Sequence, residues 1–308
     1  MQTYDVIRAG ILAALCAAIL GSSQTAHGAR YPVIAAAGDI ACDPETPAYN
    51  GGSGTTSECQ EGATARLLIR GHFTAVLTLG DNQYDAGSLA AYQTSYDSSW
   101  GLVKAITHPA PGNHEYGTPG ASGYFRYFGA AAGRPANGYY SFQIGTWHLV
   151  SLNSNCSAIG GCGTGSPEER WLRADLTSHP ARCTLAVWHH PRFSSGVHGD
   201  NAVTSALWQD LSAAHADLVL TGHDHDYERF APLDPNGRVD GSRGIREFVV
   251  GTGGRSHSGF LLIRPGSQAR NSTTFGILAL TLRPTGYDWH FVPVAGGTYT
   301  DKGSGSCH

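Results

Sequence analysis

Two histidines lie two residues apart in the segment TGHDHDYERF, residues 221 to 230. The segment follows an apolar run, Ala216 to Leu220, which is typical of a buried strand. If the backbone stays extended after the strand, His223 and His225 project to the same side of it. Two imidazoles on one side of a chain predict a metal-binding site. The acids between and after them, Asp224 and Asp226, then point away and are expected at the surface or at caps.

Four further blocks place metal-binding residue types directly after apolar runs. Each block taken alone could be a turn, a helix cap or ordinary packing. Five blocks at strand ends point to one site, because ligands bind at the carboxyl ends of strands in open α/β sheets. The mixture of carboxylate, amide, phenol and imidazole suits Fe, Zn or Mn rather than a thiolate site. The candidate ligands are Asp39, Asp81, Tyr84, Asn113, His189, His223 and His225.

Seven ligands are too many for a single structural zinc, which takes four. If Asp81 bridges two ions, each ion receives four protein ligands and keeps open positions. Two ions at roughly 3.5 to 4 Å can hold both the attacking and the leaving oxygen of a phosphoryl displacement. The residue supply therefore predicts a binuclear centre.

The elements that must position these residues follow from the apolar periodicity. The block from Ser166 to Glu169 reads as a capping box at the start of a helix. Strands and helices alternate through the first part, and the tail contains strands alone, so we predict an α/β core completed by antiparallel strands. Expected strands cover residues 31–37, 73–79, 139–145, 146–152, 183–188, 216–220, 246–250, 275–282 and 286–293, and expected helices cover 61–70, 88–100, 166–176 and 202–215.

Composition narrows the class of protein. With 308 residues, of which 41% are hydrophobic, the chain can bury a large core. Since no linker or repeat divides it, residues 29–308 are expected to form one domain. The net charge of −4 and the absence of a Lys/Arg cluster give no nucleic-acid-binding surface. The oligomeric state stays open.

Residues 1–28 have the pattern of a secretory signal peptide, with Arg8, an apolar stretch from Ala9 to Leu20 and small residues up to Gly28. The apolar stretch is too short to span a bilayer. We therefore expect a secreted or extracytoplasmic protein without a membrane span.

Six cysteines follow the predicted leader, and an even number in an exported chain predicts disulfides. Two pairs, Cys42 with Cys59 and Cys156 with Cys162, are favoured because each closes a short loop rich in Gly and Ser. Cys183 and Cys307 then pair by default.

The order GD, GDxxY, GNHE, a His-x-Pro block and GHxHxYER, from Gly38 to Arg229, resembles the calcineurin-like metallophosphoesterase superfamily. Many members have a histidine two residues after the first aspartate, where this chain has Ala41. Tyr84 is available as the replacement ligand, which points to the purple acid phosphatase branch. The resemblance implies a four-layer αββα sandwich with a binuclear metal site at the strand carboxyl ends.

The resemblance also implies roles for the ligands. Asp39, Tyr84 and His225 would hold one ion, expected to be Fe(III), and Asp81 would bridge. Asn113, His189 and His223 would hold a divalent partner such as Zn, Fe or Mn.

The fourth block leaves two choices for its ligand. The spacing from Val187 selects His190, and the position two residues before Pro191 selects His189, which we favour because the proline anchors the alignment better.

Further residues have implied or expected supporting roles. His114 would hold a phosphoryl oxygen and protonate the leaving alkoxide. His198 matches a second substrate histidine, with an exposed loop histidine as the alternative reading. Val250 to Gly254 lacks the lysine and helix of a P-loop, so we expect a tight turn beside the site. The residues expected to orient ligands are Glu115, Tyr227, Glu228 and Arg229.

The function implied is a secreted, binuclear metal-dependent phosphoric ester hydrolase in which a metal-bound hydroxide attacks phosphorus in line. The favoured form is a phosphomonoesterase of the acid phosphatase type acting on a small phosphoester. A phosphodiesterase using the same site is one alternative. A secreted metal- or phosphate-binding protein without turnover is another.

Overall fold

The computed structural model describes residues 1–2, 31–135 and 137–308. The predicted leader therefore lies outside the described residues, apart from its first two. Within the described part of the chain, none of the helices has the length and apolarity that a bilayer crossing requires.

Residues 31–308 form one compact unit built around two mixed sheets. The first sheet has the order β13-β12-β11-β1-β2-β3, and its strands β1, β2 and β3 are parallel. Its members are β1 (Val33–Ala37), β2 (Ala75–Leu79), β3 (Thr107–Ala110), β11 (Gly276–Arg283), β12 (Gly286–Pro293) and β13 (Lys302–Ser306).

The second sheet has the order β10-β8-β9-β7-β6-β5-β4. Its central strands β5, β6, β7 and β9 run parallel, and the outer strands pair antiparallel. Its members are β4 (Tyr140–Ile144), β5 (Trp147–Ser151), β6 (Cys183–Val187), β7 (Leu218–Thr221), β8 (Tyr227–Leu233), β9 (Ile245–Val250) and β10 (Ser267–Asn271). The tail strands β9 to β13 follow one another without a helix, as predicted.

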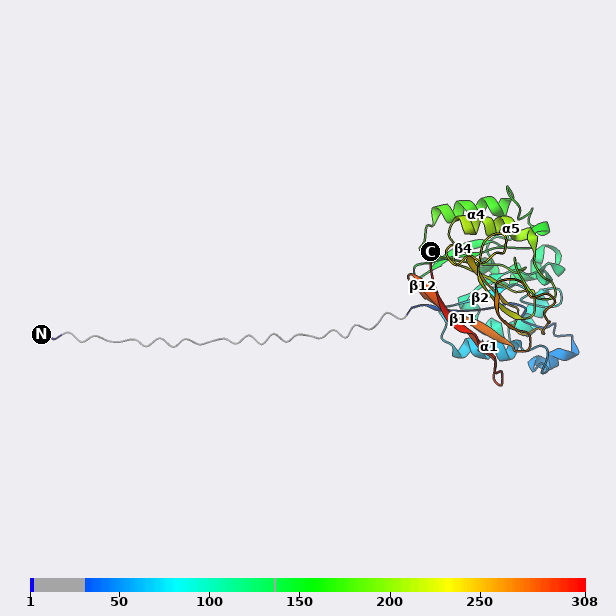
Figure 1. Ribbon diagram of the computed structural model, residues 1–308. Coiled ribbons are helices and arrows are strands. Elements are labelled where there is room, and N and C mark those ends of the chain that lie inside the picture. The colour runs from blue at the N-terminus through cyan, green and yellow to red at the C-terminus, as the bar shows by residue number, and fades with distance from the viewer. Residues whose placement is uncertain (3–30, 136) are drawn as a thin grey trace. The chain divides into compact units, whose positions relative to one another are not determined.

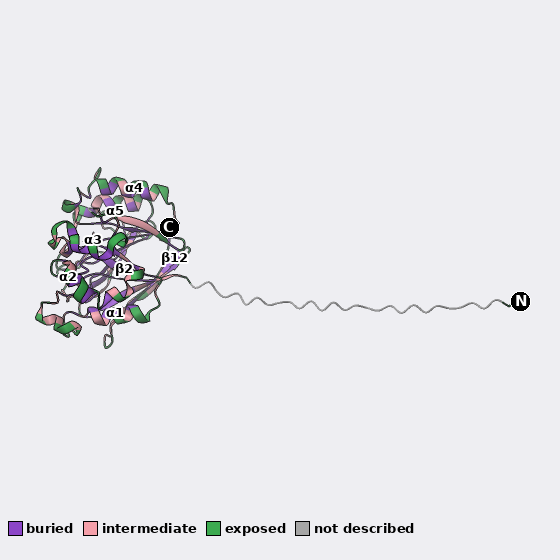
Figure 2. Ribbon diagram, turned by 180° about the vertical axis from the view of Figure 1, so that it is seen from behind, coloured by how far each residue is buried: buried purple, intermediate pink, exposed green. Residues whose placement is uncertain are grey.

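Helices cover the outer faces of the pair of sheets. In Figure 1, α4 (Pro167–Ser178) and α5 (Ser205–Ala213) lie on one side of the strands and α1 (Glu61–Arg70) on the other. Two shorter helices, α2 (Leu89–Ala91) and α3 (Ser122–Phe128), accompany them. Exposed residues lie on the outward faces of the helices and buried residues on the strands (Figure 2).

Alternation along β6 shows how the layers pack. Leu185 and Val187 belong to the core cluster that contains strands of both sheets. Ala186 faces the other way and packs with Leu172 of α4 and Trp208 of α5. The two sheets share one core between them, and helices pack on their outer faces, so the predicted four-layer αββα fold is confirmed.

The helix predicted over residues 88–100 is broken. It contains only α2, followed by a π-helical turn over Tyr92–Tyr96 and a 3-10 segment over Trp100–Ile106. Hydroxyl groups explain the break, because Ser95 donates to the carbonyl of Cys42 and Ser99 donates to the carbonyl of Ser95. Such side-chain bonds compete with the helix and bend it.

All three predicted disulfides are present: Cys42–Cys59, Cys156–Cys162 and Cys183–Cys307. The first closes the loop after β1, and the third joins the start of β6 to the segment after β13. Cross-links of this kind restrict the unfolded chain and so stabilise the fold.

Candidate metal centre

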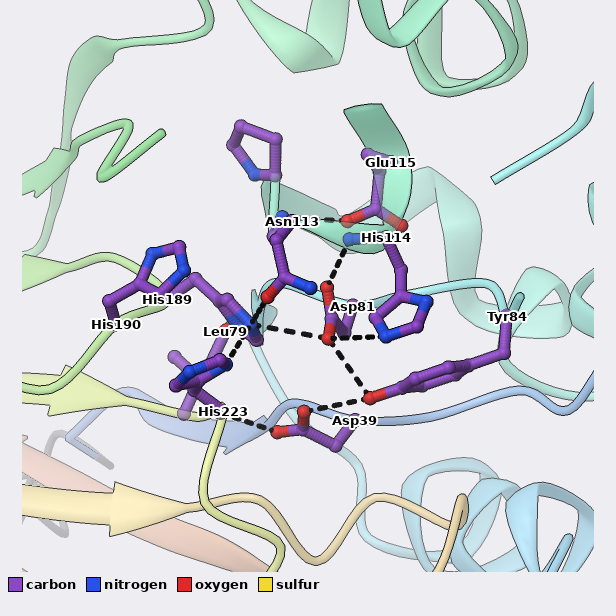
Figure 3. Close-up of polar contacts among 12 residues, drawn as sticks. Asp39, Leu79, Asp81, Tyr84, Asn113, His114, Glu115, His189, His190 and His223 are labelled. Atoms are coloured by element: carbon purple, nitrogen blue, oxygen red, sulfur yellow. Dashed lines mark hydrogen bonds and ion pairs between the residues drawn. The ribbon is translucent and has the colours of Figure 1, made fainter. Parts of the chain in front are cut away.

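The seven predicted ligands meet at one edge of the two sheets. Figure 3 labels all of them except His225. Because β1, β2 and β3 are parallel, the loops after them leave the first sheet at the same edge. The loops after β6 and β7 leave the second sheet together for the same reason. Residues far apart in sequence thus become neighbours.

One group of donor atoms surrounds the phenol oxygen of Tyr84. This oxygen lies 2.9 Å from Asp39 Oδ1, 3.0 Å from Asp81 Oδ2 and 3.0 Å from His225 Nε2.

A second group surrounds His189 Nε2. This nitrogen lies 3.0 Å from Asn113 Oδ1, 3.2 Å from Asp81 Oδ2 and 3.2 Å from His223 Nδ1. Asp81 Oδ2 belongs to both groups, which is the position that a bridging carboxylate requires.

The spacing of the donor atoms fits metal ions. With metal–ligand bonds of about 2.0 to 2.1 Å, neighbouring ligand atoms lie about 2.9 Å apart at right angles and about 3.4 Å apart at tetrahedral angles. The contacts in both groups, including 3.4 Å between His225 Nε2 and Asp39 Oδ1, fall in that range.

The electrostatics also fit cations. Asp39 and Asp81 are buried, and their ion-pair partners among the described residues are histidines. Burial alone would lower the pKa of His189, but these carboxylates raise it to about 9. Burial and the same carboxylates raise the pKa of Tyr84 well above its usual value. Without metals, the carboxylates therefore favour a protonated His189 and a neutral Tyr84. Bound cations would favour the opposite forms, a neutral His189 and an ionised Tyr84.

Hydrogen bonds orient the imidazoles. His189 Nδ1–H donates to the carbonyl of Leu79 over 2.9 Å, and His225 Nδ1 lies 2.8 Å from the hydroxyl of Ser256. Each bond directs Nε2 toward the centre, as partners of metal-binding histidines commonly do.

The contacts favour His189 over His190 as the ligand from the fourth block. His190 Nδ1 lies 2.8 Å from Ser154 Oγ, whereas a ring nitrogen of His190 comes only within 4.8 Å of those of His189 and His223. Its ring lies beside that of His223, with 4.5 Å between centroids, so His190 borders the centre.

The glycines of the motifs make room for ligands from neighbouring loops. A Cβ at Gly80 would collide with the His189 ring, and a Cβ at Gly112 would collide with the Asp81 carboxylate. The backbone is unusual as well, because Asp81 (φ 46°) and His223 (φ 72°) adopt the left-handed region. The extended backbone expected at His223 is thus wrong, although both histidines of the segment still reach the centre.

The two predicted substrate histidines lie at its rim. The His114 backbone N–H donates to Asp81 Oδ1 over 2.9 Å, and its half-buried ring places Nε2 3.9 Å from Asp81 Oδ2. His198 is exposed, and its ring centroid is 4.3 Å from that of His223.

The expectation that Asp224 and Asp226 lie at the surface is wrong, because both are fully buried. Asp224 accepts hydrogen bonds from the backbone N–H of His198 and from Ser194 Oγ. Residues 194–200 are called the 194–200 loop below. Asp224 thereby connects this loop to the segment that carries His223. The alternation argument failed because it assumed an extended backbone, and nothing else in the sequence marks this role.

Glu115 holds two of the ligand-bearing loops together. Its carboxylate accepts from the backbone N–H groups of Asn82 and Gly112 and from the hydroxyl of Tyr92. These contacts bring the loop that carries Asp81 against the loop after β3.

The other expected orienting residues act elsewhere. Glu228 accepts from the backbone N–H of Ser195 and anchors the 194–200 loop. Tyr227 and Arg229 both donate to Asp301, so they stabilise the segment before β13 rather than the centre. The expected turn from Val250 to Gly254 lies beside the site, since Gly253 N–H donates to the carbonyl of Gly38.

Residues 33–227 match the family model described as calcineurin-like phosphoesterase. The chain belongs to this family. The match covers the five motif blocks up to Tyr227 and confirms the resemblance stated from the motifs.

Curated relatives of the family include an uncharacterised protein of Mycobacterium tuberculosis, 27% identical over 209 residues, which cover 54% of this chain and 39% of that protein. Purple acid phosphatase 21 of Arabidopsis thaliana is 29% identical over 202 residues, covering 59% of this chain and 44% of the relative. The chain thus spans less than half the length of these relatives. The similarity supports the purple acid phosphatase-like branch.

Solved structures share the fold. A purple acid phosphatase from yellow lupin (Lupinus luteus) seeds aligns with a TM-score of 0.71 and 17% identity over 89% of this chain and 53% of that chain. GAP50, described as the anchor in the inner membrane complex of Plasmodium, aligns with a TM-score of 0.61 and 14% identity over 89% of this chain and 88% of that chain. Because the fold occurs in an anchor protein too, function must be argued from the site.

Proposed function

We propose that this protein is a secreted, binuclear metal-dependent phosphoric ester hydrolase that prefers phosphomonoesters, in the manner of an acid phosphatase. The observation that carries the proposal is the pair of donor groups that share Asp81 Oδ2. Membership of the phosphoesterase family supports phosphoester hydrolysis. Similarity to purple acid phosphatases supports the monoester preference.

The proposed ion positions follow the donor types. Asp39, Tyr84 and His225 supply two oxygens and one nitrogen, a set suited to Fe(III). Asn113, His189 and His223 suit a divalent Zn, Fe or Mn ion. When bound, two such ions supply an activated water and neutralise charge on the phosphoryl oxygens.

His114 is the proposed general acid. Its Nδ1 lies 2.5 Å from the carbonyl of Asp85, and as the donor to that carbonyl it leaves Nε2 facing the centre. In its imidazolium form His114 carries a second proton on Nε2. As the bond from phosphorus to the ester oxygen breaks and the bond from phosphorus to the attacking hydroxide oxygen forms, this proton passes to the leaving oxygen and His114 becomes neutral. His198, whose ring lies beside that of His223, would bind a phosphoryl oxygen.

Export is supported by two features. The chain carries three disulfides, which persist in oxidising compartments. The predicted leader over residues 1–28 would direct the chain there.

The test compares initial rates on nitrophenyl phosphate and bis(nitrophenyl) phosphate from pH 4 to 10, with Asp81→Asn as the blank. Faster turnover of the monoester with a maximum on the acid side supports the proposal. Faster turnover of the diester identifies a phosphodiesterase. No turnover of either ester, with two metals bound per chain, contradicts hydrolysis and leaves a binding protein.

The metal assignment has its own test. Iron bound by the Tyr84 phenolate is expected to give a visible absorption band that Tyr84→Phe removes. The exposed Tyr31, changed to Phe, is the matched control. An unchanged spectrum in the Tyr84 variant would contradict the phenolate assignment.

A further inference from the structure

Residues 256–264 form a loop, called the 256–264 loop below. Three consecutive apolar side chains are exposed in it. Leu261, Leu262 and Ile263 expose 74%, 68% and 50% of their surfaces. Val197 of the 194–200 loop exposes 39%. Single exposed apolar residues are common, but a contiguous group marks a binding surface.

The first end of the 256–264 loop is fastened to the metal centre. The Ser256 hydroxyl lies 2.8 Å from His225 Nδ1. Ser258 and His225 exchange two bonds, from the Ser258 N–H to the His225 carbonyl and from the His225 N–H to Ser258 Oγ. The 256–264 loop therefore starts at a residue that contacts His225, a proposed ligand.

The second end is fastened to the 194–200 loop. Phe260 forms an antiparallel bridge with Gly196, and the Leu261 N–H donates to the Ser195 carbonyl over 2.9 Å. Arg264 pairs with Asp200 at 2.6 Å. The 256–264 loop is therefore bonded both to the segment that carries His225 and to the 194–200 loop.

A pocket of about 350 Å³ lies between these two loops. Val197, His198, Leu261 and Leu262 are among the residues that line it. The His198 ring also lies beside the His223 ring, tilted by 32° and with 4.3 Å between the ring centroids, so the pocket begins one side chain away from the proposed ligands. A group in this pocket can therefore belong to a molecule whose phosphate lies at the metals.

The charge of the pocket restricts what that group is. The charged residues of its lining, Asp200 and Arg264, neutralise each other in an ion pair. The pocket thus offers no free cation for a second phosphate. It offers aliphatic surface, whose burial against an apolar group is favourable.

We propose that the Val197, Leu261 and Leu262 pocket binds the apolar alcohol part of the substrate, so that the enzyme selects phosphoesters of alkyl or aryl alcohols over those of small polar alcohols. The proposal rests on the proposed phosphoesterase function and names its substrate class. His198 forms the wall between the alcohol pocket and the phosphate position.

The test uses two monoesters whose leaving groups have similar basicity and differ in apolar length, n-hexyl phosphate and ethyl phosphate. The wild-type enzyme is expected to show a kcat/KM for the hexyl ester at least about tenfold above that for the ethyl ester, since four more CH₂ groups are buried. A ratio near one overturns the proposal.

Variants locate the selectivity. Leu261→Ser and Leu262→Ser are each expected to lower the hexyl-to-ethyl ratio several-fold, and both changes together about tenfold. Leu102→Ser, at an exposed leucine of the 3-10 segment over Trp100–Ile106, is the matched control and should keep the wild-type ratio. Inhibition by hexylphosphonate and ethylphosphonate should show the same ranking.

The outcomes separate this proposal from the function on which it rests. If no phosphomonoester is hydrolysed, nitrophenyl phosphate included, the proposed function fails. If nitrophenyl phosphate is hydrolysed but chain length has no effect, only the pocket assignment fails. If the leucine variants change self-association or vesicle binding and leave the ratio intact, the exposed leucines serve an interface and the assignment is wrong.

Discussion

Two clusters of histidine and aspartate lie at opposite ends of the parallel strands of the second sheet. The metal centre follows the carboxyl ends of β6 and β7. The other cluster joins His148 near the start of β5 to Asp175 and His179 on and after α4. Both would pass as metal sites by residue type alone.

The difference lies in how their hydrogen bonds are balanced. Asp175 accepts from the Ser141 hydroxyl and from His148 Nε2, both at 2.7 Å, and His179 Nδ1 lies 3.1 Å away. Burial raises the pKa of Asp175, but the hydrogen bonds from His148 and Ser141, together with the charges of His148 and His179, outweigh this and lower it. Hydrogen bonds from neighbouring side chains therefore satisfy this carboxylate.

In the metal centre, lone pairs face one another instead. Asn113 Oδ1, Asp81 Oδ2 and His223 Nδ1 all lie within 3.2 Å of the one atom His189 Nε2, which can donate to only one of them. A surplus of acceptors around one point distinguishes a metal centre from a structural ion pair. The comparison teaches that donor balance, more than residue type, assigns the role.

Asp81→Asn gives the largest expected effect. Loss of the shared carboxylate should lower kcat/KM for nitrophenyl phosphate by at least about 10³-fold and lower the number of metals bound per chain, since one oxygen serves both donor groups. Metal analysis and initial rates check this. Two metals retained together with wild-type activity would contradict the bridging assignment.

His114→Gln tests the proposed general acid. The variant should keep two metals and lose about 10² in kcat, because proton transfer contributes roughly 10² to 10⁴. The loss should be larger for an alkyl phosphate than for nitrophenyl phosphate, whose leaving group needs little protonation. Equal losses on the two substrates would limit His114 to binding.

Asp175→Asn is the counterpart in the other cluster. It should lower the free energy of unfolding by about 1 to 3 kcal/mol, because His148 loses its charged partner. Activity and metal content should remain those of the wild type, since the cluster lies at the opposite end of the strands. Guanidinium unfolding measures the change in stability, and metal analysis measures the metal content. A lower metal content in the variant would show that this cluster binds a metal ion of its own.

Glu168, at the other end of α4, gives an effect on stability that varies with pH. Burial raises the pKa of its carboxyl to about 8, although the Asn153 N–H bond lowers it. The unfolded chain ionises near 4.5, so the folded protein holds the extra proton between these values and stability falls as pH rises from about 4.5 to about 8. The contribution to the slope is at most about 1.4 kcal/mol per pH unit.

Glu168→Gln should remove the contribution of Glu168 to the slope of stability against pH. The variant keeps the oxygen that accepts the hydrogen bond from the Asn153 N–H. Unfolding curves at pH 5, 6, 7 and 8 measure it. A slope unchanged in the variant would show that Glu168 is ionised in the folded protein.

The sequence by itself determined most of the strands, the loops that carry chemistry and the disulfides, but it did not predict β3, β8, β10 or β13. Apolar runs end directly before Asp39, Asp81 and His189, so the motif positions follow from local pattern. The glycines of the motifs have a purely tertiary reason, because the atoms that would meet a Cβ at Gly80 belong to His189 on the other sheet.

Only the tertiary structure decided what the acids between the motifs do. Asp224 was expected at the surface, yet a left-handed backbone at His223 turns its carboxylate inward to the 194–200 loop. The exposed leucines of the 256–264 loop likewise acquire a role only from the bonds that hold them beside His225 and Ser195. Periodicity reports which residues are buried along one element, but contacts between loops depend on how the two sheets meet.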